Sequence, residues 1–461
     1  MISFRFTDFF PYILHALDFV SSIRMFNIPL IILWIIFLGI FCTLRFKFIN
    51  IKLFKHALYI LINPSHNKSN NTISNIQAFI TAISGTIGLG TISGVVIAVS
   101  TGGPGAVLWM VIIGMLGMSI KFAEVTLGFK YRVLMKECSI GGPFQYIRYG
   151  LSGLGLIKTG KVLSYIYAVI MIIAMSFGGI SFQSNQATVL LSNTFSQVDS
   201  SIITLILTVL SGLVIVGGIT RIAQVMTKLS PIMVILYITI CILVIIGHID
   251  QLIPTFKIMF DDMIHGNSIA GGITGSLIAG VRRSVFANEA GIGTSPIIHA
   301  STHETEPIRV GCIAMLEPFI DTVIVSFITG IVITLTGSYT LSNSHSIIEI
   351  KNIFSNICPI CEYVIFPFIV FAFGFSSIIT YSYYCEISWK YILKSNYSII
   401  PCRILIIIII ITSGLSKNVI SISQLGDLLF IFLTIPNGLT IILLSKDINK
   451  ELNLYLQKIK T

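Results

Sequence analysis

The chain has 461 residues, of which 54% are hydrophobic and 10% are charged, and its mean hydropathy is +0.93. This composition excludes an ordinary soluble domain, because so few charged side chains cannot cover a water-exposed surface. Apolar runs long enough to cross a bilayer recur from one end of the chain to the other. We therefore predict an all-α protein that crosses the membrane many times.

The net charge of +10 does not indicate nucleic-acid binding, because the basic residues lie in alternate loops. They are abundant from Arg45 to Lys68 and from Lys130 to Lys161, and scarce in the loops between. This is the positive-inside pattern of membrane proteins. It predicts a multi-pass protein of the plasma (cell inner) membrane, with the N-terminus outside and the C-terminus in the cytoplasm. The number of crossings must then be odd.

About eleven crossings are expected along the chain. The first is followed by a basic cytoplasmic connection that ends at residue 74, and the second is the glycine-rich segment described next. The expected crossings, in order, are 29–46, 75–100, 106–132, 162–191, 202–216, 226–246, a seventh that begins near 269, and then 310–335, 363–389, 404–413 and 425–444.

The most unusual stretch is GTIGLGTISG, from Gly85 to Gly94. Glycine inside a helix costs about 1 kcal/mol relative to alanine, so four glycines here favour an interrupted crossing. Lipid cannot satisfy the peptide groups that an interruption frees. Facing a cavity, these groups can hold a carboxylate at a helix N-terminus and a cation at carbonyls. We expect Gly85, Thr86, Gly88 and Gly90 to form a binding site, with close helix packing as the alternative.

A second glycine-interrupted segment begins five crossings later, at Ile269 to Gly275. Interrupted helices at corresponding positions of two halves are typical of transporters built from inverted repeats. We therefore expect Gly272 and Gly275 to line the same site. The alternative is a packing seam that leads into an amphipathic cytoplasmic loop around Phe286 to Pro296.

Charged side chains inside apolar segments are rare and therefore informative. Lys121 and Glu124 lie three residues apart on one expected helix and are predicted to pair. Glu317 and Asp321 lie one turn apart on another helix and are candidates for a functional role.

Uncharged polar groups also lie within the expected crossings. A buried Gln183 needs hydrogen-bond partners, which predicts either a helix–helix hydrogen bond or a substrate contact. The hydroxyls of Ser376, Ser377 and Thr380 suit a hard cation, which takes oxygen ligands. Hydrogen bonds to the carbonyl one turn earlier are the alternative for these hydroxyls.

Several motifs resemble the alanine or glycine:cation symporter family (sodium:alanine symporters). The matching strings are GLGTISGV, TGGPGAVLWM, GMSIKFAEVTLGFKYR, GGPFQYI, FANEAGIGTSPIIHA, EPFIDTVIV and FAFGFSSIITYSYY. They follow the order of the family from the second to the ninth crossing. The resemblance implies a LeuT-type fold, in which residues 1–74 supply an extra N-terminal helix and residues 75–250 and 251–461 form two inverted five-helix repeats.

The resemblance also implies the binding residues. It places the substrate carboxylate at the amides of Leu89 and Gly90, with Gln183, Ser377 and Tyr381 completing the pocket. A sodium ion is expected at the carbonyls of Ser84 and Ile87 and the hydroxyls of Ser376 and Ser377.

The chain departs from the family pattern inside this pocket. Thr91 stands where the family usually has Asn, and Leu89 where it often has a small or polar residue. Tyr381 replaces Trp, Thr380 replaces Gly and Ala287 replaces Ser. These changes bear on substrate preference more than on the fold.

Together these features predict a secondary active transporter that carries a small neutral amino acid, alanine or glycine, into the cell with sodium as the coupling ion. No other cofactor is expected. A proton-coupled transporter of the same fold is the alternative, in which Glu124, Glu317 or Asp321 would titrate, and a channel is a further one. An enzyme is not expected, because the histidines show no HExxH spacing. His299 and His303 are expected to be solvated residues of a cytoplasmic helix.

Overall fold

The structure is a computed structural model of the chain. It describes residues 23–25, 27–63, 73–134, 139–265, 272–337, 348–355, 360–394, 399–416 and 420–460. Ile269 to Gly271, the first residues of the second glycine-rich segment, lie outside the described residues. Within them, strands form only two short hairpins: β1 (Arg24–Met25) with β2 (Ile28–Pro29), and β3 (Val133–Leu134) with β4 (Ser139–Ile140).

The first half of the chain is helical from the end of the first hairpin. Its helices are α2 (Leu30–Arg45), α3 (Ile49–Lys52), α4 (Phe54–Ile62), α5 (Asn75–Thr86), α6 (Leu89–Gly102), α7 (Gly105–Lys130), α8 (Pro143–Gly153), α9 (Ile157–Ile173), the π-helix η1 (Ala174–Ser181), α10 (Phe182–Thr194), α11 (Ser200–Ile215) and α12 (Gly218–Gly247).

The second half has the same helical character and ends in an amphipathic helix. Its helices are η2 (Ile249–Gln251), α13 (Leu252–His265), α14 (Gly272–Asn288), α15 (Ser295–His299), α16 (Pro307–Ala314), α17 (Leu316–Pro318), the π-helix η3 (Phe319–Ser326), α18 (Phe327–Leu335), α19 (Ile348–Ser355), the π-helix η5 (Cys361–Ile365), α20 (Phe366–Leu393), α21 (Ile399–Gly414), α22 (Ile420–Leu443) and α23 (Ser445–Lys460).

Several helices are long and apolar enough to cross a membrane, which confirms the predicted class of protein. Besides the five segments named below, two bent helix pairs in the described part of the chain have the required length and composition: α5 with α6, bent by 43°, and the end of α22 with α23, bent by 58°. The exact number of crossings stays a prediction. The five unbent segments that are long and apolar enough to span a bilayer are Gly105–Lys130, Ile157–Thr194, Gly218–Gly247, Pro307–Leu335 and Cys361–Leu393.

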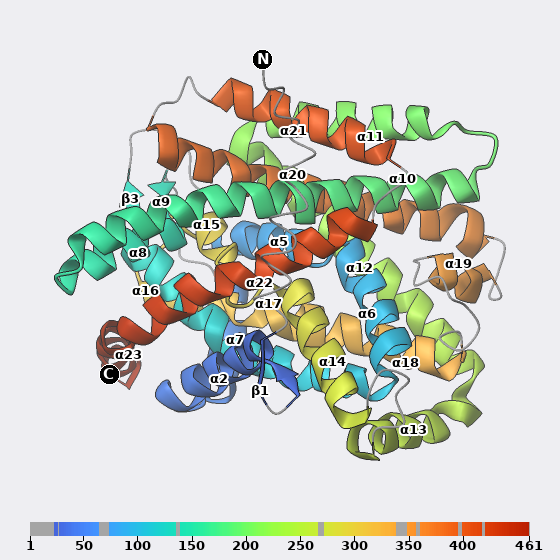
Figure 1. The fold of residues 1–461 in the computed structure, drawn as a ribbon, viewed down its shortest axis with the longest axis horizontal. Helices are drawn as coiled ribbons and strands as arrows, with labels where there is room; N and C mark the ends of the chain where they lie inside the picture. Colours follow the sequence, from blue (N-terminus) through green and yellow to red (C-terminus); the bar gives the residue numbers. More distant parts are fainter. Residues whose placement is uncertain are drawn as a thin grey trace.

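Helices that are distant in sequence lie side by side at the centre of the molecule. The half-helix α6 contacts α14, and α5 contacts α15, α20 and α12 (Figure 1). The most apolar windows of α7 and α20 are 72% buried, whereas that of α12 is only 33% buried. Therefore α7 and α20 belong to the core, and α12 presents apolar side chains outward, as a lipid-facing helix does.

Local sequence explains where the central helices begin. Ser74 accepts a hydrogen bond from the Gln77 amide and the Gln77 side chain accepts one from the Ser74 amide, which is a capping box at the start of α5. The turn before α7 contains Gly103 with φ 77°, an angle that glycine adopts without strain. The Gly105 amide then donates to Asp262 Oδ2 at 2.8 Å. The TGGPG sequence therefore forms the turn between α6 and α7.

The helix α8 is only partly a surface element. Phe144, Tyr146 and Ile147 are fully buried, and α8 packs against α9. Burial of its two aromatic rings favours this placement over exposure to water.

Paired glycines, Gly178 and Gly426, allow η1 and α22 to approach closely. A Cβ on Gly178 would lie 2.5 Å from the Gly426 Cα, so Gly178→Ala forces η1 away from α22. We expect this variant to lower stability by about 1–3 kcal/mol, the usual effect of over-packing. Gly153→Ala is the matched control, because nothing lies within 4 Å of the added methyl group. Thermal unfolding in detergent measures both, and equal midpoints for Gly178→Ala and the unmodified chain would contradict the close approach.

Candidate functional site

The crossing formed by α5 and α6 is interrupted at Ile87 and Gly88, within the glycine-rich stretch that predicted an interruption. Gly88 is extended, with φ −121° and ψ −168°, and Ile87 is fully buried. Leu89 begins α6, so its amide is among the donors that a helix start leaves without an intrahelical partner.

A second interruption follows α14, at residues 289–294, before the chain resumes as α15. Here Glu289 has φ 54°, Gly291 has φ 91° and Gly293 has φ 82°. Glycine adopts such angles readily, whereas a glutamate rarely does. Because α6 contacts α14 and α5 contacts α15, the two interruptions lie at the same level.

The expectation that Gly272 and Gly275 mark this second interruption is wrong. Gly272 opens α14, and the Gly275 carbonyl lies against Gly102 at the far end of α6. The helix then continues to Asn288, about 20 Å along its axis from Gly275. The packing alternative therefore describes Gly275. The segment from Phe286 to Pro296, weighed as a cytoplasmic loop, contains the interruption instead.

Residues predicted from three different crossings meet beside Gly88. The Leu89 amide donates to Gln183 Oε1 at 3.0 Å. A Cβ on Gly88 would overlap Ser377 Oγ and lie 2.7 Å from Gln183 Nε2. The structure thus joins Gly88, Leu89, Gln183 and Ser377, and their role as substrate ligands stays a prediction.

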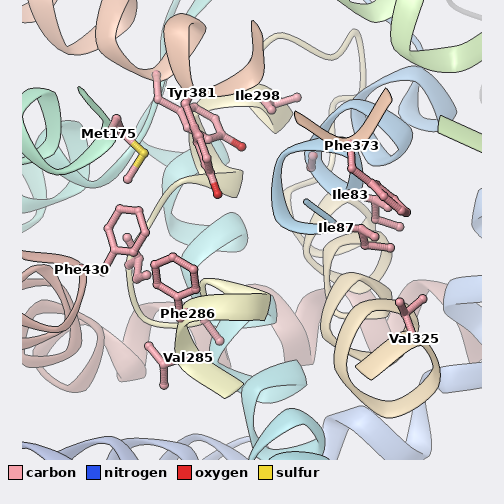
Figure 2. Close-up of a cluster of buried hydrophobic side chains, with 14 of the residues drawn as sticks. Ile83, Ile87, Met175, Val285, Phe286, Ile298, Val325, Phe373, Tyr381 and Phe430 are labelled. Atoms are coloured by element: carbon pink, nitrogen blue, oxygen red, sulfur yellow. The ribbon is translucent and has the colours of Figure 1, made fainter. Parts of the chain in front are cut away.

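Aromatic rings close the other side of α6. A Cβ on Gly90 would lie 2.5 Å from Phe286 Cε1. The Phe286 ring centroid lies 5.4 Å from that of Phe430 and 5.9 Å from that of Phe182. Figure 2 shows Phe286 and Phe430 next to each other, with Tyr381 pointing toward them from α20. Space beside Gly90 is therefore narrow and apolar.

Tyr381 connects α20 to the second interruption. Its hydroxyl donates to Glu289 Oε1 at 2.7 Å, and Glu289 also accepts a hydrogen bond from Thr294. The Tyr381 ring packs directly on Gly179 of η1. Sequence analysis did not select Glu289. The signal that was available is a carboxylate next to a Gly-x-Gly pattern inside an apolar frame.

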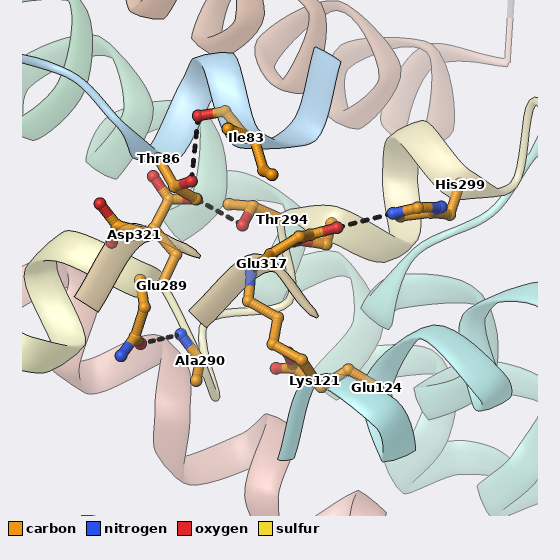
Figure 3. Close-up of polar contacts among 12 residues, drawn as sticks. Ile83, Thr86, Lys121, Glu124, Glu289, Ala290, Thr294, His299, Glu317 and Asp321 are labelled. Atoms are coloured by element: carbon orange, nitrogen blue, oxygen red, sulfur yellow. Dashed lines mark hydrogen bonds and ion pairs between the residues drawn. The ribbon is translucent and has the colours of Figure 1, made fainter. Parts of the chain in front are cut away.

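The remaining predicted residues of α5 lie at the site but face their own helix or α20. The Thr86 hydroxyl donates to the Ile83 carbonyl at 3.1 Å (Figure 3). A Cβ on Gly85 would lie 2.7 Å from Thr380 Cγ2. Gly85 therefore serves the close contact between α5 and α20.

Oxygen atoms of α5 and α20 gather around the Ser84 carbonyl. Ser376 Oγ lies 3.1 Å from that carbonyl oxygen and 3.1 Å from the Phe373 carbonyl. Ser377 Oγ lies 3.3 Å from it and 3.1 Å from the Gly85 carbonyl. Each hydroxyl has one proton, so each faces more acceptors than it can satisfy. Such a set of neutral oxygens fits a small hard cation. It includes the predicted Ser84, Ser376 and Ser377, and it adds the carbonyls of Gly85 and Phe373.

A buried ion pair fixes the chain just after the second interruption. Lys121 Nζ lies 3.5 Å from Glu317 Oε2 and donates to Ser295 Oγ. His299 Nε2 lies 2.7 Å from Glu317 Oε1 (Figure 3). All four residues are buried. The expectation of a solvated His299 is therefore wrong, because α15 folds inward against α7.

Lys121 does not pair with Glu124 as predicted. Glu124 accepts a hydrogen bond from Asn437 of α22, which also receives one from Tyr146. Spacing along one helix predicts which side chains are neighbours. Here, however, Lys121 contacts residues of α15 and α17, and Glu124 contacts a residue of α22.

A polar network closes the face at which α5 begins. Asn75 Nδ2 donates to Glu304 Oε2 at 3.0 Å, and Arg309 Nε donates to the same oxygen at 3.1 Å. Arg132 donates to three carbonyls of the segment after α15. Burial raises the pKa of Glu304, but a backbone amide, Asn75 and Arg309 together hold that pKa below its usual value. The carboxylate is thus charged near neutral pH.

Two interrupted helices that meet at one level inside a helical membrane protein, with helix-start amides and clustered oxygens at the interruptions, define a secondary transporter. A family-level sequence comparison agrees. The chain belongs to the sodium:alanine symporter family, whose pattern matches residues 13–461. It is a transport protein and not an enzyme.

Individual relatives cover almost the whole chain. The chain is 31% identical to the sodium/alanine symporter AgcS of Methanococcus maripaludis, over 94% of this chain and 97% of AgcS. It is 30% identical to the probable sodium/glutamine symporter GlnT of Bacillus subtilis, over 94% of this chain and 88% of GlnT. The solved structure of MhsT in complex with L-phenylalanine has a TM-score of 0.60 at 16% identity and covers 82% of this chain and 90% of MhsT. This likeness shows a shared fold.

The buried ion pair supplies a stability test. Lys121→Met leaves Glu317 buried without its lysine, which typically costs about 3–5 kcal/mol. We expect a large fall in the thermal midpoint in detergent, and recovery of most of it in Lys121→Met combined with Glu317→Gln. Lys158→Met is the control, because Lys158 is exposed. A Lys121→Met midpoint equal to that of the control would argue against this pairing.

Proposed function

We propose that the chain is a sodium-coupled symporter that carries a small neutral amino acid, alanine or glycine, into the cell by alternating access. The observation that carries this proposal is the shared position of two polar clusters at one interruption. The Leu89 amide faces Gln183, and the Ser84 and Gly85 carbonyls face Ser376 and Ser377. One short peptide segment therefore offers donors to an anion and acceptors to a cation.

The substrate carboxylate is assigned to the amides of Leu89 and Gly90, in the first turn of α6 and at the positive end of its dipole. Gln183 occupies the Leu89 amide in this structure, and turning its side-chain amide would offer a donor to the carboxylate instead. Phe286 against Gly90 leaves room for a small side chain only. The names of AgcS and GlnT support a neutral amino acid, and the narrow apolar wall favours the smaller one.

Sodium is assigned to the oxygen set around the Ser84 carbonyl. An ion there would join α5 to α20 at the interruption and so favour one arrangement of the site. Coupling between ion and substrate requires that the ion bind the substrate-competent state more tightly, typically by about 1–3 kcal/mol.

Alternating access requires that the closed face open. We assign the network of Asn75, Glu304 and Arg309 to the cytoplasmic side, with the N-terminus outside and the C-terminus inside, following the distribution of basic residues. Eleven crossings, arranged as an extra helix and two inverted repeats at 75–250 and 251–461, complete this proposal. Rocking of one helix bundle against the other would then expose the site to either side.

A proton-coupled transporter of the same fold is the second candidate, and one observation favours it. Glu124 Oε2 is buried and has no hydrogen-bond partner within the described residues. A carboxylate oxygen in that position is a natural place for a proton, since burying an unpaired charge is costly. Glu317 fits this role less well, because Lys121 and His299 already contact it.

Uptake into proteoliposomes tests the coupling ion. With pH equal on both sides, labelled alanine or glycine should accumulate only when a sodium gradient points inward. Ser377→Ala should raise the half-saturating sodium concentration about tenfold, because one oxygen ligand is lost. Accumulation driven by a pH gradient in sodium-free buffer would instead support the proton-coupled candidate.

Gly88 tests the interruption itself. Gly88→Ala places a methyl group on Ser377 Oγ and close to Gln183 Nε2, where it fills the space between the two clusters. We expect uptake to fall at least tenfold, equivalent to about 1.4 kcal/mol. Gly94 lies in the uninterrupted part of α6, four residues after Gly90. The added methyl group of Gly94→Ala meets only Arg283 Cδ, at 3.5 Å, so this variant should transport normally. Similar uptake by both variants would contradict the assignment.

A further inference from the structure

The short helices α3 and α4, which lie between α2 and α5, expose an apolar face. In α4, the side chains of Leu58, Tyr59 and Ile62 are 40–72% exposed. Helical spacing places these three on one face, whereas Ala57 and Ile60 on the opposite face are buried. A helix of nine residues is too short to cross a bilayer, which needs about 20 residues. An exposed apolar face on such a helix fits the boundary between the bilayer and water.

Lysines accompany this apolar face. Lys47, Lys52 and Lys55 are all exposed, and Lys55 lies on the same face of α4 as Leu58 and Tyr59. Residues 45–63 contain no aspartate or glutamate. A helix that joins basic and apolar side chains in this way lies in the plane of the membrane, where the lysines reach the level of the headgroups.

The C-terminal helix α23 extends the same surface. His56 Nε2 of α4 lies 2.8 Å from the Tyr455 hydroxyl of α23. The two acidic residues of α23 contact residues at the end of α7, whereas Lys446 and Lys450 are exposed. The charge that α23 adds to this surface is therefore also positive.

The helix α13 provides a contrast, because it lies at the opposite end of the molecule from α23 (Figure 1). It also exposes large apolar side chains, among them Ile253, Ile258 and Phe260. Residues 249–265, however, contain three aspartates and a single lysine, Lys257. Both surfaces suit a membrane boundary, and of these two only the α3–α4 surface combines its apolar face with an excess of positive charge.

We propose that the α3–α4 surface, from Lys47 to Ile62, binds the anionic headgroups of phospholipids in the cytoplasmic leaflet, with Lys52 and Lys55 at the phosphates. Charge complementarity is the reason for an anionic headgroup, since lysines next to a membrane attract anionic lipids and gain little from zwitterionic ones. The choice of the cytoplasmic leaflet rests on the orientation given in the proposed function, whereas the preference for an anionic headgroup does not.

This lipid contact would bear on the closed face of the transporter. The helix α4 packs against α16, which contains Arg309, the partner of Glu304. Lys458 Nζ of α23 lies 2.7 Å from Glu306 Oε1, just before α16. A lipid that holds α4 and α23 at the membrane surface would therefore also hold the start of α16, beside the network that must open.

Quenching of tryptophan fluorescence by brominated lipids tests this preference without transport. The full-length Tyr59→Trp protein is reconstituted into phosphatidylcholine that contains brominated phosphatidylglycerol or brominated phosphatidylcholine, and the signal of the unmodified chain is subtracted. We expect phosphatidylglycerol to bind about fivefold more tightly than phosphatidylcholine beside residue 59, because lysines flank it. Phe260→Trp in α13 is the matched control and should show no preference. Equal affinities at residue 59, or the same preference at residue 260, would overturn the proposal.

Charge variants of the Tyr59→Trp protein identify the lysines that act. Lys52→Gln combined with Lys55→Gln should remove the preference, and Lys52→Arg combined with Lys55→Arg should keep it, because the positive charge attracts the headgroup. Lys228→Gln combined with Lys257→Gln removes the same number of exposed charges elsewhere and should also keep it. A preference that survives Lys52→Gln with Lys55→Gln, or that is lost equally in the Lys228 and Lys257 control, would overturn the proposal.

The outcomes also separate this inference from the symport proposal. Preference for phosphatidylglycerol beside residue 59 without sodium-driven uptake would refute symport and leave the lipid surface supported. Sodium-driven uptake by a chain that binds both lipids equally would refute the lipid surface alone.

Discussion

Peptide groups that are freed inside a membrane must find partners within the protein, and this constraint governs the centre of the molecule. Lipid offers no hydrogen bonds, so the interruptions at Ile87–Gly88 and at 289–294 are possible only because polar groups surround them. Gln183 takes the Leu89 amide, and the α20 serines face the α5 carbonyls. Gly88 has no side chain because Ser377 and Gln183 occupy that space. The proposed function assigns the same groups that stabilise the interruption to the substrate and the ion.

The two interruptions are held in different ways. At Gly88 and Leu89 the first interruption is held by uncharged amides, carbonyls and hydroxyls, whereas charged side chains hold the second. Tyr381 and Thr294 hold Glu289, and Lys121, Glu317 and His299 hold the start of α15. Buried charges are costly to separate, so the second interruption is expected to keep its shape. Neutral contacts at the first are easier to exchange, which suits a segment that must bind and release.

Sodium:alanine symporter family membership and the two meeting interruptions describe a secondary transporter. In the proposed function, ion and substrate would share one short peptide. In the proposed cycle, sodium at the Ser84 carbonyl would bring α5 and α20 together. Opening of the closed face would then have to separate Asn75 from Glu304. Ion binding and access would be coupled because both depend on where α5 lies.

The sequence by itself determined the membrane class, the broken second crossing and the family. The apolar composition indicates a membrane protein, and four glycines in an apolar run favour an interrupted helix. Through the resemblance, the sequence also predicted two groups of residues that the structure brings into contact: Leu89 with Gln183, and Ser84 with Ser376 and Ser377. The tertiary structure decided what depends on partners distant in sequence. Lys121 pairs with Glu317 and not with Glu124, and His299 is buried. The second interruption begins at Glu289 and not at Gly272 or Gly275. A glycine that packs against a neighbouring helix and a glycine that adopts a left-handed angle look the same in a sequence, and only the neighbouring helices distinguish them.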